Sequence, residues 1–147
     1  MIRYLNLPKI PKYITKTISK NVNDYQWDKN SQPKPGYEES YIWTDSNNSI
    51  VNNWCKTNIC EDMYWAFQLM RKDIDLHRDR GTEIKLSYLL DSGGDNVVTE
   101  FLDEQLNVTH SYVIEPNRWH ILNVKCLHRV ININSLRFSV TGRIFPN

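Results

Sequence analysis

A histidine and a carboxylate stand two positions apart in the segment 75–83, which reads DLHRDRGTE. In an extended chain, residues two apart point to the same side, so His77 and Asp79 can direct an imidazole and a carboxylate at one point. A second histidine, His128, stands beside Arg129 in the stretch CLHRVININSLRFSV. Two histidines and one carboxylate on one face of a metal are the ligand set of non-haem Fe(II) sites, and they leave the opposite positions open. The spacing alone also fits histidines with a purely structural role, which is the commoner case for a lone histidine.

An arginine and a serine form a second pair with a spacing of two, nine positions after His128. Arg137 and Ser139 lie in the segment that reads as the last strand, so they share a face. A guanidinium pairs bidentately with a carboxylate, and a neighbouring hydroxyl can donate one further hydrogen bond. An arginine on an inward strand face is costly unless it meets an anion. We therefore expect Arg137 to pair either with a carboxylate of the protein or with a dicarboxylate ligand.

From about residue 63 onward, hydrophobic residues recur with a period of two, which predicts strands separated by short turns. Gly, Asn, Asp, Pro and Ser, the usual turn residues, gather at 92–96, 115–117 and 132–135. Short antiparallel strands that follow an N-terminal helical part favour a mainly β fold, a β-sandwich or jelly roll. The expected strands cover residues 63–70, 74–77, 83–90, 97–102, 108–114, 118–124, 128–133 and 137–144.

Residues 1–62 are punctuated by prolines and are expected to form helical and irregular support for the jelly-roll core at 63–147. Ile10, Ile14 and Ile18 recur every four residues, which predicts a short amphipathic helix opening near Pro11. A second short helix is expected over 45–55, where capping residues precede apolar ones, and 32–40 reads as an exposed loop. The length of 147 residues favours one domain with one core.

The composition narrows the class of protein. Eighteen basic and seventeen acidic residues leave a formal net charge of +1, which gives no electrostatic case for a nucleic-acid protein. No apolar stretch has the length of a signal-peptide core or of a membrane span of about 20 residues, so we expect a cytoplasmic protein. Cys55, Cys60 and Cys126 lack a metal-binding spacing and are expected to be free thiols.

The ordered set His-x-Asp, distal histidine and Arg-x-Ser in a β-rich region resembles the Fe(II)/2-oxoglutarate-dependent oxygenase family. The run HRDRGTEIKLSYLLDSGGDNVVTEF is similar to the metal-binding segment of that family, and WHILNVKCLHRVININSLRFSV is similar to its closing segment. The resemblance covers about residues 63–145 and fits best the short members carried by cyanobacterial phages. It implies a double-stranded β-helix, and location in the host cytoplasm if the chain is viral.

The resemblance also implies roles for the residues above. His77, Asp79 and His128 would hold Fe(II), and Arg137, assisted by Ser139, would bind the distal carboxylate of the cosubstrate 2-oxoglutarate. With dioxygen, a C–H bond of the primary substrate would be hydroxylated, and succinate and CO2 would be the coproducts. Family members that halogenate lack the carboxylate that Asp79 supplies, so hydroxylation is favoured over halogenation.

Further side chains are expected around this centre. The resemblance implies that Tyr88 touches 2-oxoglutarate, while the alternative is an aromatic ring that fills the core. Thr99 and Asn123 are expected on strands that line the same cavity. Arg78 is expected at the mouth, where it would meet substrate, and strand alternation predicts that Arg129 points away from the iron.

His110 and His120 have no partner at a ligand-like spacing, and we expect them to be surface or strand residues rather than metal ligands. Trp119 is expected in the core. Trp54 and Trp65 are expected to attach the N-terminal helices to the sheet.

Two other functions fit the same elements. A jelly roll without chemistry would be a binding or structural module, and a cupin-type metal enzyme would act without 2-oxoglutarate. Arg137 and Ser139 argue against both, because an inert module needs no buried Arg-x-Ser pair and a cupin usually supplies more histidine ligands. The fold does not select the primary substrate, for which we expect a small molecule or a protein side chain.

Overall fold

The computed structural model describes residues 2–22, 41–45, 49–79, 81 and 84–144, which contain two helices and ten strands. The bounds are β1 Ile2–Tyr4, α1 Lys12–Lys20, β2 Tyr41–Asp45, α2 Ile50–Asn58, β3 Tyr64–Met70, β4 Ile74–His77, β5 Ile84–Ser92, β6 Val98–Leu102, β7 Val108–Tyr112, β8 Trp119–Asn123, β9 His128–Ile131 and β10 Arg137–Arg143. The expected loop at 32–40 lies outside the described residues.

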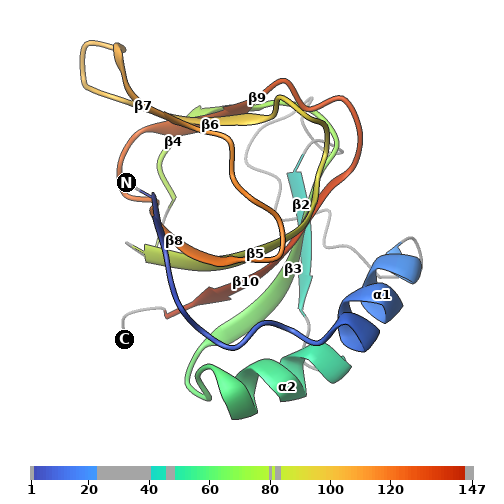
Figure 1. The fold of residues 1–147 in the computed structure, drawn as a ribbon. Coiled ribbons are helices and arrows are strands. Elements are labelled where there is room, and N and C mark those ends of the chain that lie inside the picture. Colours follow the sequence, from blue (N-terminus) through green and yellow to red (C-terminus); the bar gives the residue numbers. More distant parts are fainter. Residues whose placement is uncertain (1, 23–40, 46–48, 80, 82–83, 145–147) are drawn as a thin grey trace.

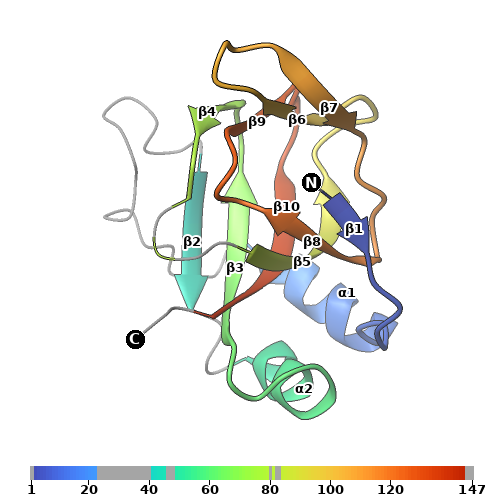
Figure 2. The same ribbon diagram turned by 90° about the vertical axis from the view of Figure 1, so that its left-hand side faces the viewer.

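The strands form two antiparallel sheets that face each other. The six-stranded sheet has the order β1-β8-β5-β10-β3-β2, and the four-stranded sheet has the order β4-β9-β6-β7. Figures 1 and 2 show the four-stranded sheet at the top, the six-stranded sheet below it, and both helices against the lower face of the larger sheet. Every strand expected after residue 63 is present, and the prediction of a mainly β jelly roll is confirmed.

The six-stranded sheet is buried on both faces, and strand alternation assigns a different chemistry to each face. Along β10, Phe138 and Val140 belong to an apolar cluster that also contains Ile14 and Ile18 of α1. Arg137 is equally buried, but it faces the four-stranded sheet across a cavity. The helices therefore cover an apolar face, and the opposite face carries buried polar groups.

Both helices follow from local sequence signals. In α1, the residues at helical spacing, Ile14 and Ile18, are the buried ones, as the four-residue recurrence predicts. The second helix begins later than the expected 45–55, because Ser49 caps it: the Ser49 hydroxyl accepts a hydrogen bond from the Asn52 N–H at 3.1 Å. Asp45 ends strand β2 instead.

The N-terminal part contributes more than helical support, which corrects the expectation for residues 1–62. Strand β1 pairs with β8, and β2 pairs with β3. These two strands form the edges of the six-stranded sheet. They were missed because one is three residues long and the other lies in the proline-punctuated region, where period two is hard to detect.

Tryptophans hold the N-terminal segments onto the sheet, as predicted. Trp65 and Trp119 are buried, with ring centroids 5.8 Å apart. The Trp119 indole donates to the Pro8 carbonyl at 2.8 Å, and the Trp65 indole donates to the Cys60 carbonyl at 3.1 Å. Trp54 packs against the same cluster.

Neither described helix has the length and apolar character that crossing a membrane requires.

Candidate metal centre

Two histidines meet because β4 and β9 pair with His77 opposite His128. Their ring centroids are 4.3 Å apart. Each Nδ1 lies beside a backbone carbonyl, His77 at 2.7 Å from Asp75 O and His128 at 2.8 Å from Cys126 O. A carbonyl only accepts hydrogen bonds, so in the neutral rings Nδ1 carries the hydrogen and Nε2 keeps the lone pair. Both imidazoles are thus held in the tautomer of a metal ligand that binds through Nε2.

Asp79 completes the cluster from the segment that follows β4. Its backbone N–H donates to Val124 O at 2.9 Å, which fixes the chain beside the site. Its Oδ1 lies 3.2 Å from His77 Nε2 and 3.4 Å from His128 Nε2. All three ligand atoms lie within 4.8 Å of one another. The donor set fits a divalent metal held on one face by two imidazoles and one carboxylate.

The surroundings keep Asp79 ionised. Burial alone would raise the pKa of Asp79, but the contacts with His128 and His77 and the positive charges of Lys85 and Arg143 hold that pKa well below its usual range. The Arg143 Nη2 lies 3.3 Å from Asp79 Oδ2, the oxygen that faces away from the histidines. One carboxylate oxygen therefore meets a cation of the protein, and the other is directed at the histidine pair.

The three side chains of the cluster differ in their exposure to solvent. The side chain of His77 is 33% exposed, whereas those of His128 and Asp79 are 6% and 7% exposed. Phe101 backs the His128 ring at a centroid distance of 5.9 Å. His77 is therefore the most exposed member of the cluster.

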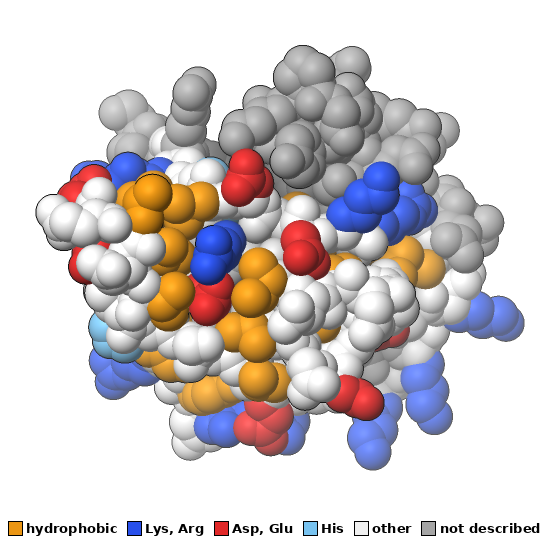
Figure 3. All heavy atoms as spheres, turned by 90° about the horizontal axis from the view of Figure 1, so that it is seen from above, with side chains coloured by type: hydrophobic (Ala, Val, Ile, Leu, Met, Phe, Trp, Pro, Cys, Tyr) orange, Lys and Arg blue, Asp and Glu red, His pale blue; other side chains and the backbone are white. Residues whose placement is uncertain are grey.

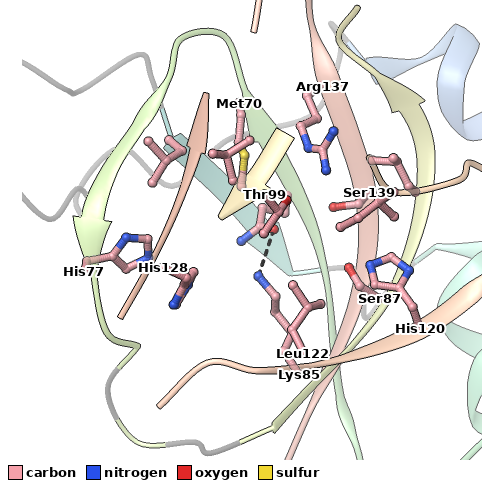
Figure 4. Close-up of a pocket in the computed structure, with 15 residues that line it drawn as sticks. Met70, His77, Lys85, Ser87, Thr99, His120, Leu122, His128, Arg137 and Ser139 are labelled. Carbon is pink, nitrogen blue, oxygen red and sulfur yellow. Dashed lines mark hydrogen bonds between the residues drawn. The ribbon is translucent and has the colours of Figure 1, made fainter. Parts of the chain in front are cut away.

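Arg137 and Ser139 line the same cavity as the two histidines (Figure 4). The Arg137 Nη1 donates to Ser92 O at 2.9 Å. Burial lowers the pKa of Arg137 to about 10, although the charge of Asp91 opposes this shift, so the guanidinium stays charged at neutral pH. Gly93 makes room for it: its φ is +79°, and a Cβ there would lie 2.9 Å from the Arg137 Cβ.

Sequence reasoning missed several cavity residues because they resemble the solvent face of an amphipathic strand. Alternation along β5 places Lys85 and Ser87 on the cavity side, and Gln68 of β3 joins them. These polar residues are buried because the second sheet covers them. The signal that could have identified them is a strand in which polar residues alternate with apolar ones while helices cover the apolar face.

His120 is a residue of strand β8, as expected, and its side chain also lines the cavity. It is 2% exposed, with its Nδ1 3.2 Å from Arg118 O. Burial, with the charges of Lys85 and Arg137, lowers the pKa of His120 to about 4, although the contact with the Arg118 carbonyl opposes this. His120 is therefore neutral in the folded protein and lies outside the cluster of metal-ligating groups found among the described residues.

A buried neutral His120 predicts a pH-dependent stability. The pKa is about 4 in the folded chain and 6.5 ordinarily, so the unfolded chain binds more protons in this range and stability falls as the pH drops through it. Relative to His120→Gln, we expect the wild type to lose about 2 kcal/mol more between about pH 7 and about pH 5. Urea unfolding of both proteins at the two pH values measures this difference. Parallel losses in the two proteins would contradict it.

Two expected site residues lie elsewhere. Tyr88 packs in the apolar cluster under the helices, at a centroid distance of 4.9 Å from Trp119, and burial raises its pKa. It faces away from the cavity, because the cavity side of β5 carries Lys85 and Ser87. Asn123 is exposed, and its side chain accepts a hydrogen bond from the Lys125 N–H at 3.2 Å. Both residues occupy the alternate positions of their strands that point away from the cavity.

The remaining expected residues lie at or around the cavity. Thr99 lines it, is buried, and its hydroxyl has no hydrogen-bond partner among the described residues. Arg78 is exposed beside His77 and pairs with Glu104. Arg129 pairs with Glu100 at 2.8 Å, on the outer face of the four-stranded sheet. Figure 3 views the molecule from that side, where charged side chains lie among hydrophobic ones.

No protein-family model matches the sequence, and no curated protein matches it. Solved structures do match the fold. An oxidoreductase of the 2OG-Fe(II) oxygenase family from Burkholderia pseudomallei is 9% identical with a TM-score of 0.62, over 91% of this chain and 78% of that one. A Pseudomonas putida prolyl-4-hydroxylase is 12% identical with a TM-score of 0.62, over 99% of this chain and 92% of that one.

The Escherichia coli ribosomal oxygenase YcfD, solved in complex with cobalt and 2-oxoglutarate, is 11% identical with a TM-score of 0.51, over 79% of this chain and 36% of that one. At such low sequence identity, the structural similarity is evidence for a shared fold and not for a shared activity. The fold expected from the sequence resemblance is thereby confirmed: the chain has the double-stranded β-helix fold of the 2-oxoglutarate/Fe(II) oxygenases.

Proposed function

We propose that the protein is an Fe(II)- and 2-oxoglutarate-dependent dioxygenase that hydroxylates a C–H bond of a small molecule or a protein side chain. The observation that carries the proposal is the convergence of His77 Nε2, His128 Nε2 and Asp79 Oδ1 at one edge of a cavity. A non-catalytic module gains nothing from burying such a cluster, because buried charged and polar groups are costly.

The reaction class follows from the groups that share the cavity. Bound Fe(II), 2-oxoglutarate and dioxygen together supply oxidative decarboxylation, in which the cosubstrate gives succinate and CO2 and the substrate C–H bond becomes C–OH. His77, Asp79 and His128 would hold the metal on one face. Arg137 would pair with the distal carboxylate, and the hydroxyl of Ser139 would donate to the same group. A cupin-type enzyme that acts without 2-oxoglutarate would have no use for this buried guanidinium.

The primary substrate would approach from the His77 side, the exposed side of the cluster. Arg78, which follows His77 and is half-exposed in its pair with Glu104, would contact an approaching molecule at this mouth. The cavity walls, formed by Phe101 behind His128 and by the two sheets, would exclude water from the opposite side.

Anaerobic titration tests the proposal. Addition of Fe(II) and then 2-oxoglutarate to the protein should give the weak visible charge-transfer absorption of an iron–2-oxoacid chelate. Calorimetry should show that 2-oxoglutarate binds the metal-loaded protein. Zn(II) in place of Fe(II) serves as the control, because it should support binding without the absorption band. If the protein binds no 2-oxoglutarate with either metal, the proposed function is wrong.

A further inference from the structure

We infer that Lys85 is a second cationic anchor for the cosubstrate, which binds the carboxylate at the metal end while Arg137 binds the distal one. The inference rests on the proposed function and adds a residue that the Arg-x-Ser pattern does not include. Lys85 would thus be a positioning residue that touches the cosubstrate beside the metal.

The first observation that supports this inference is the position of Lys85 in the cavity. It lies on the cavity side of β5 and is 6% exposed. In Figure 4 its side chain rises between the histidine pair on one side and Arg137 with Ser139 on the other. The charge that stabilises its ammonium is that of Asp79, the carboxylate of the candidate metal cluster. Lys85 is therefore placed toward the metal end of the cavity.

The charges around the cavity carry the second step. Among the described residues, the buried cations Lys85 and Arg143 lie beside the carboxylate of Asp79, and the charge of Asp91 offsets that of the buried Arg137. A divalent metal would add two further positive charges. Buried charges of one sign are costly unless an ion of the opposite sign joins them. The surplus fits a dianion, and one guanidinium at Arg137 accounts for only one of its two carboxylates.

The hydrogen bonds of Lys85 carry the third step. Its ammonium has three donors but makes one hydrogen bond among the described residues, to Gln68 Oε1 at 3.3 Å. The cavity that these side chains leave is about 40 Å³, room for about three water molecules at roughly 10–15 Å³ each. A dicarboxylate needs more room, and the flexible four-carbon stem of Lys85 can provide it by turning the ammonium from Gln68 to a carboxylate.

Two ligands that differ only in the distal carboxylate test the assignment. N-Oxalylglycine carries both carboxylates, and N-methyloxamate keeps only the metal-proximal one. Their affinities are measured in Mn(II)-loaded protein through the change in water-proton relaxation, which also detects weak binding. For Lys85→Met we expect both ligands to bind about tenfold to a hundredfold more weakly, the usual effect of losing a charged hydrogen bond. For Arg137→Ala only N-oxalylglycine should lose affinity.

The Mn(II) affinity separates anchoring from folding. Methionine keeps the volume of the lysine stem and removes a positive charge near the metal, so Lys85→Met should bind Mn(II) as tightly as the wild type or more tightly. A merely structural role would lower the affinity for metal and ligands together. Lys85→Gln provides a second neutral variant, and Lys16→Met, on the exposed side of α1, controls for loss of a lysine.

Each outcome decides between distinct ideas. If Lys85→Met and Lys85→Gln leave N-methyloxamate affinity unchanged, Lys85 is no anchor at the metal end and the inference is wrong, while the proposed function stands. If the wild type binds Mn(II) but neither ligand, the proposed function fails as well. Equal losses for both ligands with metal affinity retained would establish Lys85 as the proximal anchor.

Discussion

Replacing His128 by alanine is expected to abolish Fe(II) binding at micromolar metal. The imidazole supplies one of three ligands, and it is the buried one of the two histidines. Loss of an outer-shell partner alone costs about 10–100-fold in metal affinity, so loss of a ligand should cost about a hundredfold or more. Without the metal, the chelate absorption and substrate-dependent succinate formation should disappear together. Equilibrium dialysis against Fe(II) under anaerobic conditions measures the effect.

His110→Ala is the matched control. His110 is exposed on β7, and its Nδ1 contacts the Thr109 hydroxyl at 3.1 Å, outside the cluster. The same substitution there should leave metal binding unchanged. Equal Fe(II) affinity in the His128→Ala variant and the wild type, with both proteins folded, would show that the metal is held elsewhere.

The second large effect is expected at Arg137. Its replacement by alanine should weaken 2-oxoglutarate binding about a hundredfold, because removal of one partner of a buried, hydrogen-bonded charge pair costs about 2–5 kcal/mol. Fe(II) affinity should remain within a few-fold of the wild type, because Arg137 belongs to β10 and is not one of the clustered ligand groups. Calorimetric titration of the Mn(II)-loaded variant with 2-oxoglutarate measures this loss.

Arg129→Ala controls for the loss of an arginine. Arg129 follows His128 directly but pairs with Glu100 on the outer face of the sheet, so its removal should leave 2-oxoglutarate affinity unchanged. If Arg137→Ala loses metal instead of 2-oxoglutarate affinity, the role proposed for Arg137 is wrong.

Spacing in the sequence was sufficient to predict which residues share a face. The pairs His77 with Asp79 and Arg137 with Ser139 do lie together, because alternation in an extended chain is a local property. The distal His128 joins them through strand pairing between β4 and β9. That pairing is a long-range feature, and only the resemblance to a known family could supply it.

Alternation predicts which residues share a strand face, but it does not predict whether that face points to the helices or to the cavity. Two positions were open to Tyr88, contact with the cosubstrate or packing in the core, and its strand face lies under the helices with Trp119. For the same reason Lys85 was overlooked: a lysine beside apolar residues reads as solvent-exposed until a second sheet is known to cover it. Arg143, which pairs with Asp79, is six positions beyond Arg137, and no local pattern connects it to a carboxylate 64 positions earlier.

The double burial of β10 has a consequence for how this protein can change during evolution. Phe138 and Val140 fill the apolar layer under the helices, where truncation leaves a void and costs about 2–5 kcal/mol. Arg137 and Ser139 face the cavity, where a buried charged group is costly to desolvate and is weak evidence for stability of the fold. Alternate positions of one strand are thus under separate selection, for stability or for ligand. Substitutions at the cavity positions can therefore change the ligand preference while the residues under the helices keep the fold stable.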